Sequence, residues 1–168
     1  MSDEIVNRVA DSGLITLSLE DLYPQGQRMT LDLANFLFER LMLREKDFRE
    51  KIDQRDWGLY SDAFVNVICS EDAIIPQWAY MLIGERLQPH ARKVVFGPRE
   101  VLESQLMEEV LNGFPYEEYE GKRVILKGCS KLPIPPQAFS TFTMRIRPYV
   151  RSLMYGEACS TVPVYKKR

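Results

Sequence analysis

Three cysteines, each followed directly by a serine, have the most distinctive chemistry in this sequence: Cys69, Cys129 and Cys159. Thiolates are ligands for soft and borderline metal ions, and three of them on one ion would make a metal site. We therefore predict a three-cysteine site that binds zinc or iron. The C-x-x-C spacing that usually marks zinc ligands is absent.

A tetrahedral metal site needs a fourth ligand besides three cysteines. The candidates are Glu157, Asp72, His90, a water or a substrate, and an open fourth position would permit catalysis. His90 is the only histidine, and we interpret it first as a packing or surface residue.

The same cysteines have two other interpretations. Free cysteine is among the most buried residue types, so these side chains can be ordinary core residues. A cysteine shortly before a helix N-terminus can also be a reactive thiol, because the positive end of the helix dipole favours the thiolate. No histidine base lies near any cysteine in the sequence, and the three interpretations stay open.

Short apolar runs place the first two cysteines at strand ends. Residues 63–68 and 123–127 have the composition of buried strands, and each run leads into a Cys-Ser pair. A loop and then a helix follow, with Pro76 in the first turn of one helix and Pro135 in that of the other. Residues 94–96 and 153–155 predict second strands, each closed by a glycine.

These elements form an internal repeat of residues 60–97 and 119–156. The two segments align at one constant offset, which pairs Pro76 with Pro135 and Gly97 with Gly156. Arg92 through Gly97 likewise aligns with Arg151 through Gly156. The repeat predicts two strand–helix–strand units.

The remaining segments complete an α/β fold. A helix is expected over residues 98–112, between the repeats, and a charged helix over residues 45–54. The N-terminal extension predicts strands at 14–19 and 29–33, separated by a hairpin-like turn at 24–26. We predict one domain, residues 1–168, with a mainly parallel sheet and helices on both faces.

The sequence does not give the order of the strands in the sheet, but one common order bears on the cysteines. In a doubly wound order, the two strands that open the repeats are neighbours, and their carboxyl ends flank the crevice where such sheets bind ligands. Adjacent strands lie about 4.8 Å apart, which is close enough for their terminal thiolates to share one ion. Cys69, Cys129 and Cys159 are therefore expected to cluster at the carboxyl edge of the sheet.

Composition and charge narrow the class of partner. The 168 residues carry 22 Lys and Arg against 24 Asp and Glu, so we expect no nucleic-acid partner. The longest apolar stretch, residues 73–83, is too short to span a bilayer, and the first residues lack the apolar region of a signal peptide. We expect a cytoplasmic protein with no membrane association, whose partners are other proteins.

Four segments resemble a known family: residues 69–80, 154–163, 43–50 and 127–130. Together they are similar to a domain-of-unknown-function family of small Bacteroidetes proteins, the family numbered twenty-four-eighty, and the likeness covers essentially the whole chain. The family has no assigned activity. The resemblance implies a link to iron–sulfur cluster assembly, because its members often lie beside components of that process.

Three functions from different classes follow. The first is an accessory or binding protein with a three-cysteine metal site that acts in iron–sulfur traffic. The second is a metal-free protein-interaction domain in which the cysteines belong to the core. The third is an enzyme that acts on a small molecule through a reactive cysteine.

Overall fold

The computed structural model describes residues 13–128, 131–157 and 159–167. The chain divides into two compact units, which we call unit 1 and unit 2 and describe separately. Unit 2 is Gln25–Glu103, and unit 1 is formed by Met1–Pro24 together with Ser104–Arg168. Unit 2 is therefore an insertion in the sequence of unit 1.

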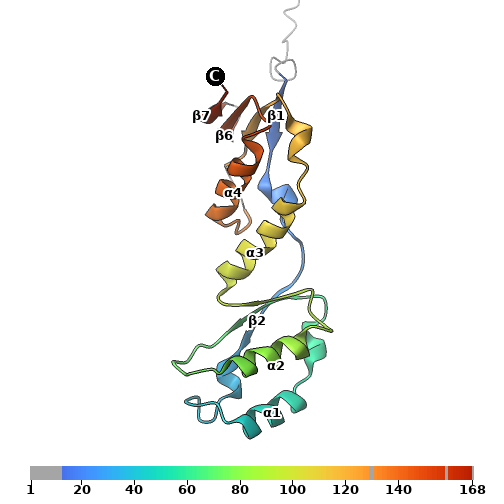
Figure 1. Cartoon of the computed structure of the whole chain (residues 1–168), viewed down its shortest axis with the longest axis vertical. Helices are drawn as coiled ribbons and strands as arrows, with labels where there is room; N and C mark the ends of the chain where they lie inside the picture. Colours follow the sequence, from blue (N-terminus) through green and yellow to red (C-terminus); the bar gives the residue numbers. More distant parts are fainter. Residues whose placement is uncertain (1–12, 129–130, 158, 168) are drawn as a thin grey trace, which may run out of the picture. The chain divides into compact units, whose positions relative to one another are not determined.

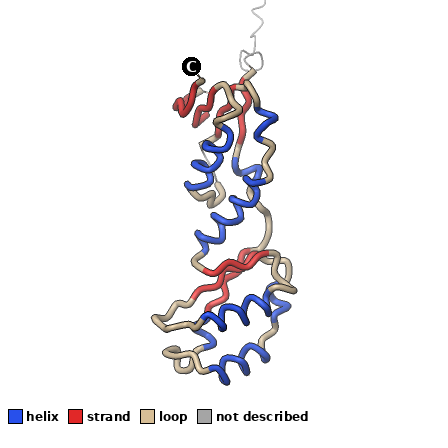
Figure 2. Tube along the Cα trace, in the orientation of Figure 1, coloured by secondary structure: helices blue, strands red, loops and turns tan. Residues whose placement is uncertain are grey.

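Unit 2 contains a three-stranded parallel sheet in the order β2-β3-β4 (Figures 1 and 2). The strands are β2 (Arg28–Asp32), β3 (Phe64–Ile68) and β4 (Lys93–Phe96). The central strand β3 is buried along nearly its whole length, as its almost continuous apolar sequence predicts. Its one polar member, Asn66, is satisfied by Thr30 and by the carbonyl of Gly97.

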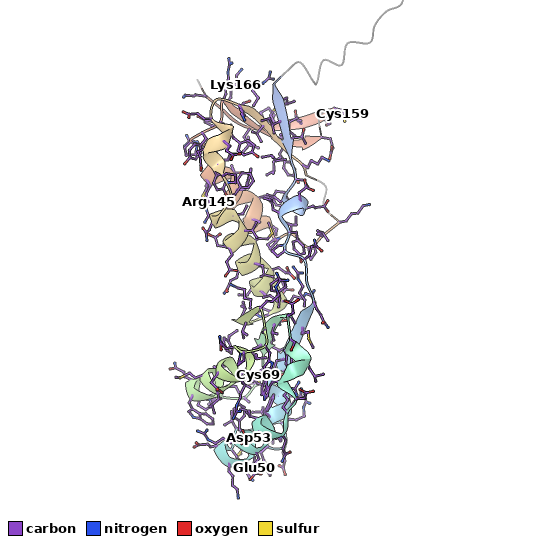
Figure 3. All side chains as sticks on the ribbon, turned by 90° about the vertical axis from the view of Figure 1, so that its right-hand side faces the viewer. Glu50, Asp53, Cys69, Arg145, Cys159 and Lys166 are labelled. Carbon is purple, nitrogen blue, oxygen red and sulfur yellow. The ribbon has the colours of Figure 1, made fainter. Side chains whose placement is uncertain are left out.

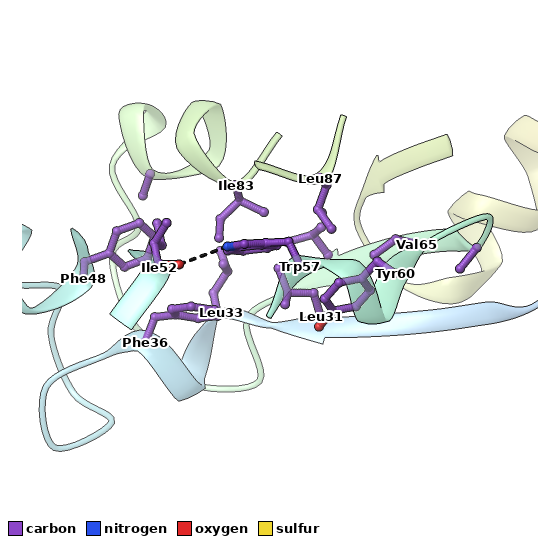
Figure 4. Close-up of a cluster of buried hydrophobic side chains, with 13 residues drawn as sticks. Leu31, Leu33, Phe36, Phe48, Ile52, Trp57, Tyr60, Val65, Ile83 and Leu87 are labelled. Carbon is purple, nitrogen blue, oxygen red and sulfur yellow. Dashed lines mark hydrogen bonds between the residues drawn. The ribbon is translucent and has the colours of Figure 1, made fainter. Parts of the chain in front are cut away.

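The helices of unit 2 pack beside this sheet, with α2 lying between the strands and α1 (Figure 1). They are α1 (Glu45–Gln54), α2 (Gln77–Leu87) and the short 3-10 turns η2 (Leu33–Phe36) and η3 (Trp57–Tyr60). Trp57 lies inside the core, with Ile83 of α2 on one side and Phe36 on the other (Figure 4). Its indole N–H donates to the Ile52 carbonyl at 3.0 Å, so the one polar atom of the side chain has a partner.

Unit 1 contains a four-stranded sheet in the order β1-β5-β6-β7. The strands are β1 (Leu14–Leu17), β5 (Arg123–Leu126), β6 (Ser152–Glu157) and β7 (Ser160–Lys166). The first three are parallel, and β7 returns antiparallel beside β6. Its helical elements are η1 (Leu19–Leu22), the greater part of α3 (Arg99–Asn112), η4 (Tyr116–Tyr119) and α4 (Pro136–Ile146).

Apart from β7, the two units have the same sequence of elements. In each unit, the first strand pairs with the second strand, which precedes a helix. Arg28 of β2 faces Phe64 of β3, and Leu14 of β1 faces Arg123 of β5. Backbone hydrogen bonds recur at the same offset as the sequence repeat. The Asp62 N–H donates to the His90 carbonyl in unit 2, and the Gly121 N–H donates to the Tyr149 carbonyl in unit 1.

The α/β class and the mainly parallel strand pairing are confirmed. The strands form two sheets, however, where we expected one. The hairpin-like turn at 24–26 does not pair β1 with β2, because each of them pairs with a later strand of a different sheet. That the 168 residues act as one domain stays a prediction. Within the described ranges, no helix combines the length and apolarity needed to cross a membrane.

Candidate functional site

The structure places the predicted cysteines on elements of different units. Cys69 follows β3 of unit 2, and Cys159 lies in the connection between β6 and β7 of unit 1 (Figure 3). Cys129 lies outside the described residues. The strands that precede Cys69 and Cys129, β3 and β5, belong to different sheets, so the expected placement of all three cysteines at one sheet edge loses its basis.

The surroundings of Cys69 are those of a packed side chain. Cys69 is half-buried against the core of unit 2, and its Sγ donates to the Glu71 carbonyl at 3.4 Å. The loop that it begins is tied down by Arg40, whose Nε donates to the Glu71 carboxylate at 2.7 Å. These contacts agree with the interpretation of Cys69 as a core residue.

Asp32, at the end of β2, is the other anchor of this loop. Its Oδ1 accepts from the Ala34 N–H at 2.9 Å and from the Ser70 N–H at 3.0 Å. Partial burial raises the pKa of Asp32, but the hydrogen bonds from Ser70 and Ala34 and the charge of Arg40 outweigh it, and the pKa is lowered. The carboxylate is thus occupied in holding two loops together at the carboxyl edge of this sheet.

The proposed fourth ligands do not complete a metal site among the described residues. His90 follows α2, at the opposite end of that helix from the loop of Cys69, and its carbonyl accepts from Asp62. Asp72 and Glu157 are exposed and belong to different units. Across residues 13–128, 131–157 and 159–167, no three His, Cys, Asp or Glu side chains are grouped as ligands for a metal ion.

The main difference between the two units is β7. Both units have three parallel strands, but in unit 1 the last of them, β6, carries an additional antiparallel neighbour. The pairing of β6 with β7 shifts its register between Leu153 and Met154, which marks an irregularity in the ladder. β7 is therefore the element that distinguishes unit 1 from unit 2.

An apolar groove lies between α4 and the strands β6 and β7. Its volume is about 350 Å³. The lining side chains are mostly apolar or aromatic: Leu126, Phe139, Ser140, Thr143, Met144, Leu153, Met154, Tyr155 and Val164. Large apolar side chains of the lining are exposed to solvent: Met144 is 67% and Val164 is 49% exposed. The groove is therefore an open apolar surface that could receive apolar groups of a ligand.

Helix α4 has a polar contact with α3 through Arg145. Arg145 forms an ion pair with Glu108 of α3, and Tyr116 donates its hydroxyl to the Leu111 carbonyl at 2.9 Å. Burial raises the pKa of Tyr116, and the neighbouring Arg145 opposes this without cancelling it. The pKa of Arg145 is raised: burial alone would lower it, but the contacts with Glu108 and Tyr116 dominate.

The sequence interpretation did not find β7 or the groove. Residues 160–166 contain two valines, a threonine and a tyrosine, and this enrichment in strand-forming residues was the available signal. Pro163 obscures it, because proline is uncommon inside strands except at edges and bulges. In the structure β7 is the edge strand and Pro163 lies beside the register shift, which explains why proline is tolerated.

These features define a class of protein: an α/β chain built from two units with the same element order, one of which carries an extra strand and an apolar groove. The chain belongs to the family described as Protein of unknown function (DUF2480), which it matches over residues 3–167. The resemblance noted in the sequence is thereby confirmed. No curated protein and no solved structure matches the chain.

Proposed function

We propose that this protein is a protein-interaction module whose apolar groove on unit 1 binds an apolar segment of a partner protein. The observation that carries the proposal is the exposure of large apolar side chains along a preformed groove. Met144 and Val164 stand on opposite sides of it, one on α4 and the other on β7. Contiguous exposed apolar surface of this kind is a mark of interaction sites.

The openness of the groove favours a macromolecular occupant. Small-molecule sites enclose most of their ligand's surface, whereas Met144 and Val164 remain exposed to solvent. A small apolar molecule would be left partly in water, and a protein segment would cover both side chains. Methionine suits such a surface because its flexible thioether adapts to different partners.

Site-specific photo-crosslinking in the native host tests this proposal. A photoreactive residue at Met144 is expected to give one discrete product, which disappears when Val164→Glu places a charge in the groove. The matched control is the same photoreactive residue at Met81, which is 73% exposed on the equivalent helix of unit 2. No product at Met144, the same products at Met81, or a product that is a second copy of this chain would each contradict the proposal.

A thiolate metal site is the second candidate function. The strand order of unit 1 favours a site built from two of the three cysteines. β5 and β6 are adjacent and parallel; Cys129 follows Gly128 shortly after β5, and the exposed Cys159 follows β6. We propose that Cys129 and Cys159 supply the thiolates for a zinc or iron ion in iron–sulfur cluster assembly. Cys69, packed in unit 2, is expected to be dispensable.

Elemental analysis of the untagged protein tests the thiolate proposal. Near-stoichiometric zinc or iron is expected, and it should be lost in Cys129→Ser and in Cys159→Ser. Cys69→Ser is the matched control and should retain the metal. A wild-type protein purified without metal, and unable to take up zinc or ferrous iron added under reducing conditions, would rule the site out.

A further inference from the structure

A second cavity of unit 1 is lined by positive charges and contains no acidic residue. Its volume is about 440 Å³, and it lies where β5 and β6 begin and β7 ends. Arg123, Arg151 and Lys166 contribute the charges, and Ser152 and Tyr165 contribute hydroxyl groups. This concentration is local, because the chain as a whole carries a net charge of -2.

In unit 2 the equivalent position has internal partners. Arg92, the counterpart of Arg151, has its Nε 3.5 Å from the Asp62 carboxylate and donates from Nη1 to the Gln25 carbonyl at 2.9 Å. Its guanidinium also lies 4.5 Å from the centre of the Phe64 ring. This cation therefore contacts a carboxylate, a carbonyl and an aromatic ring of its own unit.

Unit 1 lacks the acid of this corner and has an arginine in place of a phenylalanine. Gly121 stands where unit 2 has Asp62, and the equivalence is secured by their hydrogen bonds to Tyr149 and His90 and by their positive φ angles of 69° and 58°. Arg123 stands where unit 2 has Phe64, since each begins its strand in the same register. The corner of unit 1 therefore has Arg123 beside Arg151 and no counterpart of the Asp62 carboxylate, while Ser152 stands where unit 2 has Lys93.

No carboxylate among the described residues forms an ion pair with these three cations. Arg123, Arg151 and Lys166 are exposed, and their like charges at one cavity repel each other unless an anion is present. Guanidinium groups offer forked donors that match the oxygens of phosphate, and a lysine adds a point charge. A dianionic phosphate would satisfy more of these donors than a single carboxylate.

We propose that this cavity binds the phosphate group of a small phosphorylated molecule, with Arg123 and Arg151 as its main ligands and Lys166 and Ser152 as supporting donors. The cavity volume leaves room for more than the phosphate group itself. This site is distinct from the apolar groove proposed above: its charged lining comes from β5, the start of β6 and the end of β7, with no residue of α4, and the two linings share Met154.

The probe is inorganic phosphate, titrated into the ¹⁵N-labelled full chain at constant ionic strength maintained with chloride. Saturable shifts are expected for the amides of residues 123 and 151–152. Arg123→Gln and Arg151→Gln should each weaken binding about tenfold, the loss expected for one charge-assisted contact. Arg92→Gln is the matched control and should leave the affinity unchanged.

Parallel titrations distinguish the sources of the phosphate. A phosphorylated sugar that binds more tightly than inorganic phosphate supports a small metabolite as the ligand, and equal affinities support free phosphate. A single-stranded oligonucleotide that binds more tightly than both would overturn the proposal in favour of nucleic acid. Shifts that do not saturate, or that chloride reproduces, would show charge screening alone and also overturn it.

A variant of the N-terminal segment tests competition by the chain's own acids. Asp3, Glu4 and Asp11 precede β1, whose first residue pairs with Arg123. The proposal expects phosphate to bind the native chain with the same affinity as a variant in which these three acids are replaced by their amides. Binding that appears only in that variant would show that the chain's own acids occupy the cavity and would refute an external ligand.

Discussion

The Asp32 carboxylate accepts one local and one long-range hydrogen bond. As the residue before η2 it accepts from the Ala34 N–H, which is the local role that Ser18 has before η1 in unit 1. Its carboxylate also accepts from Ser70, far away in sequence, at the start of the loop after β3. Ser18 Oγ accepts from the Glu20 N–H at 3.3 Å, which is the local contact.

The stability conferred by Asp32 is expected to depend on pH. The folded-state pKa lies below the unfolded value of 3.8, so the stabilisation is fully present above pH 3.8 and is lost as the pH falls below it. Asp32→Ser keeps a capping oxygen and removes the charge. We expect it to cost about 1–2 kcal/mol at pH 7.

Urea unfolding of the wild type and of Asp32→Ser at several pH values checks this expectation. The difference in unfolding free energy should shrink as the carboxyl is protonated below pH 3.8. Ser18→Ala is the control, because it removes a cap of comparable geometry without an ionisable group. A difference for Asp32→Ser that is the same at pH 7 and pH 3 would show that the charge is irrelevant.

At the scale of elements, the addition of β7 separates the two units. The hairpin between β6 and β7 depends on Gly156, which has φ 125°, a conformation that side chains disfavour. A Cβ at this position would lie 2.4 Å from the Ser160 carbonyl oxygen. Gly97, its counterpart in unit 2, has φ 142°, but a Cβ there would meet only the Val101 side chain at 3.5 Å.

Replacing these two glycines separates backbone strain from steric exclusion. Gly97→Ala is expected to cost about 1–3 kcal/mol, which is the usual strain of such a conformation. Gly156→Ala should cost more and should detach β7, because its Cβ would overlap backbone that cannot move without breaking the pairing. Hydrogen exchange of the β6–β7 amides measures this, and equal losses for the two variants would argue against the steric contribution.

The behaviour of the whole molecule depends on whether its two units unfold together. Helix α3 crosses the boundary between them, with Leu102 buried in its first half and Met107 in the core of unit 1. Fraying of one unit would therefore propagate into an element that the other needs. We expect one cooperative transition, in agreement with a single domain of 168 residues.

Core substitutions in each unit test this cooperativity. Ile83→Ala in unit 2 and Phe142→Ala in unit 1 each remove a fully buried side chain and should cost about 2–5 kcal/mol. Both tryptophans, Trp57 and Trp78, lie in unit 2, so their fluorescence follows that unit alone. Phe142→Ala should nevertheless lower the midpoint of the fluorescence transition. A midpoint that it leaves unchanged would show that the units unfold independently.

The sequence by itself determined the local elements of this protein. Pro136 begins α4, Gly97 and Gly156 take positive φ where the second strands end or turn, and α1 covers the predicted residues 45–54. These features depend on neighbouring residues, because capping, proline geometry and glycine conformation are properties of short segments. The constant offset of the repeat, the α/β class and the family were also predicted from the sequence, because short segments are enough to recognise them.

Only the tertiary structure decided which strands pair and where the cavities lie. Nothing in the residues of β1 shows that it pairs with β5 rather than with β2, because a buried parallel strand presents a similar apolar pattern to every possible neighbour. Strand pairing is decided by the burial of faces that lie far apart in sequence. That choice divided the sheet in two, placed Cys69 and Cys159 on different units, and created the groove and the cationic cavity beside β7.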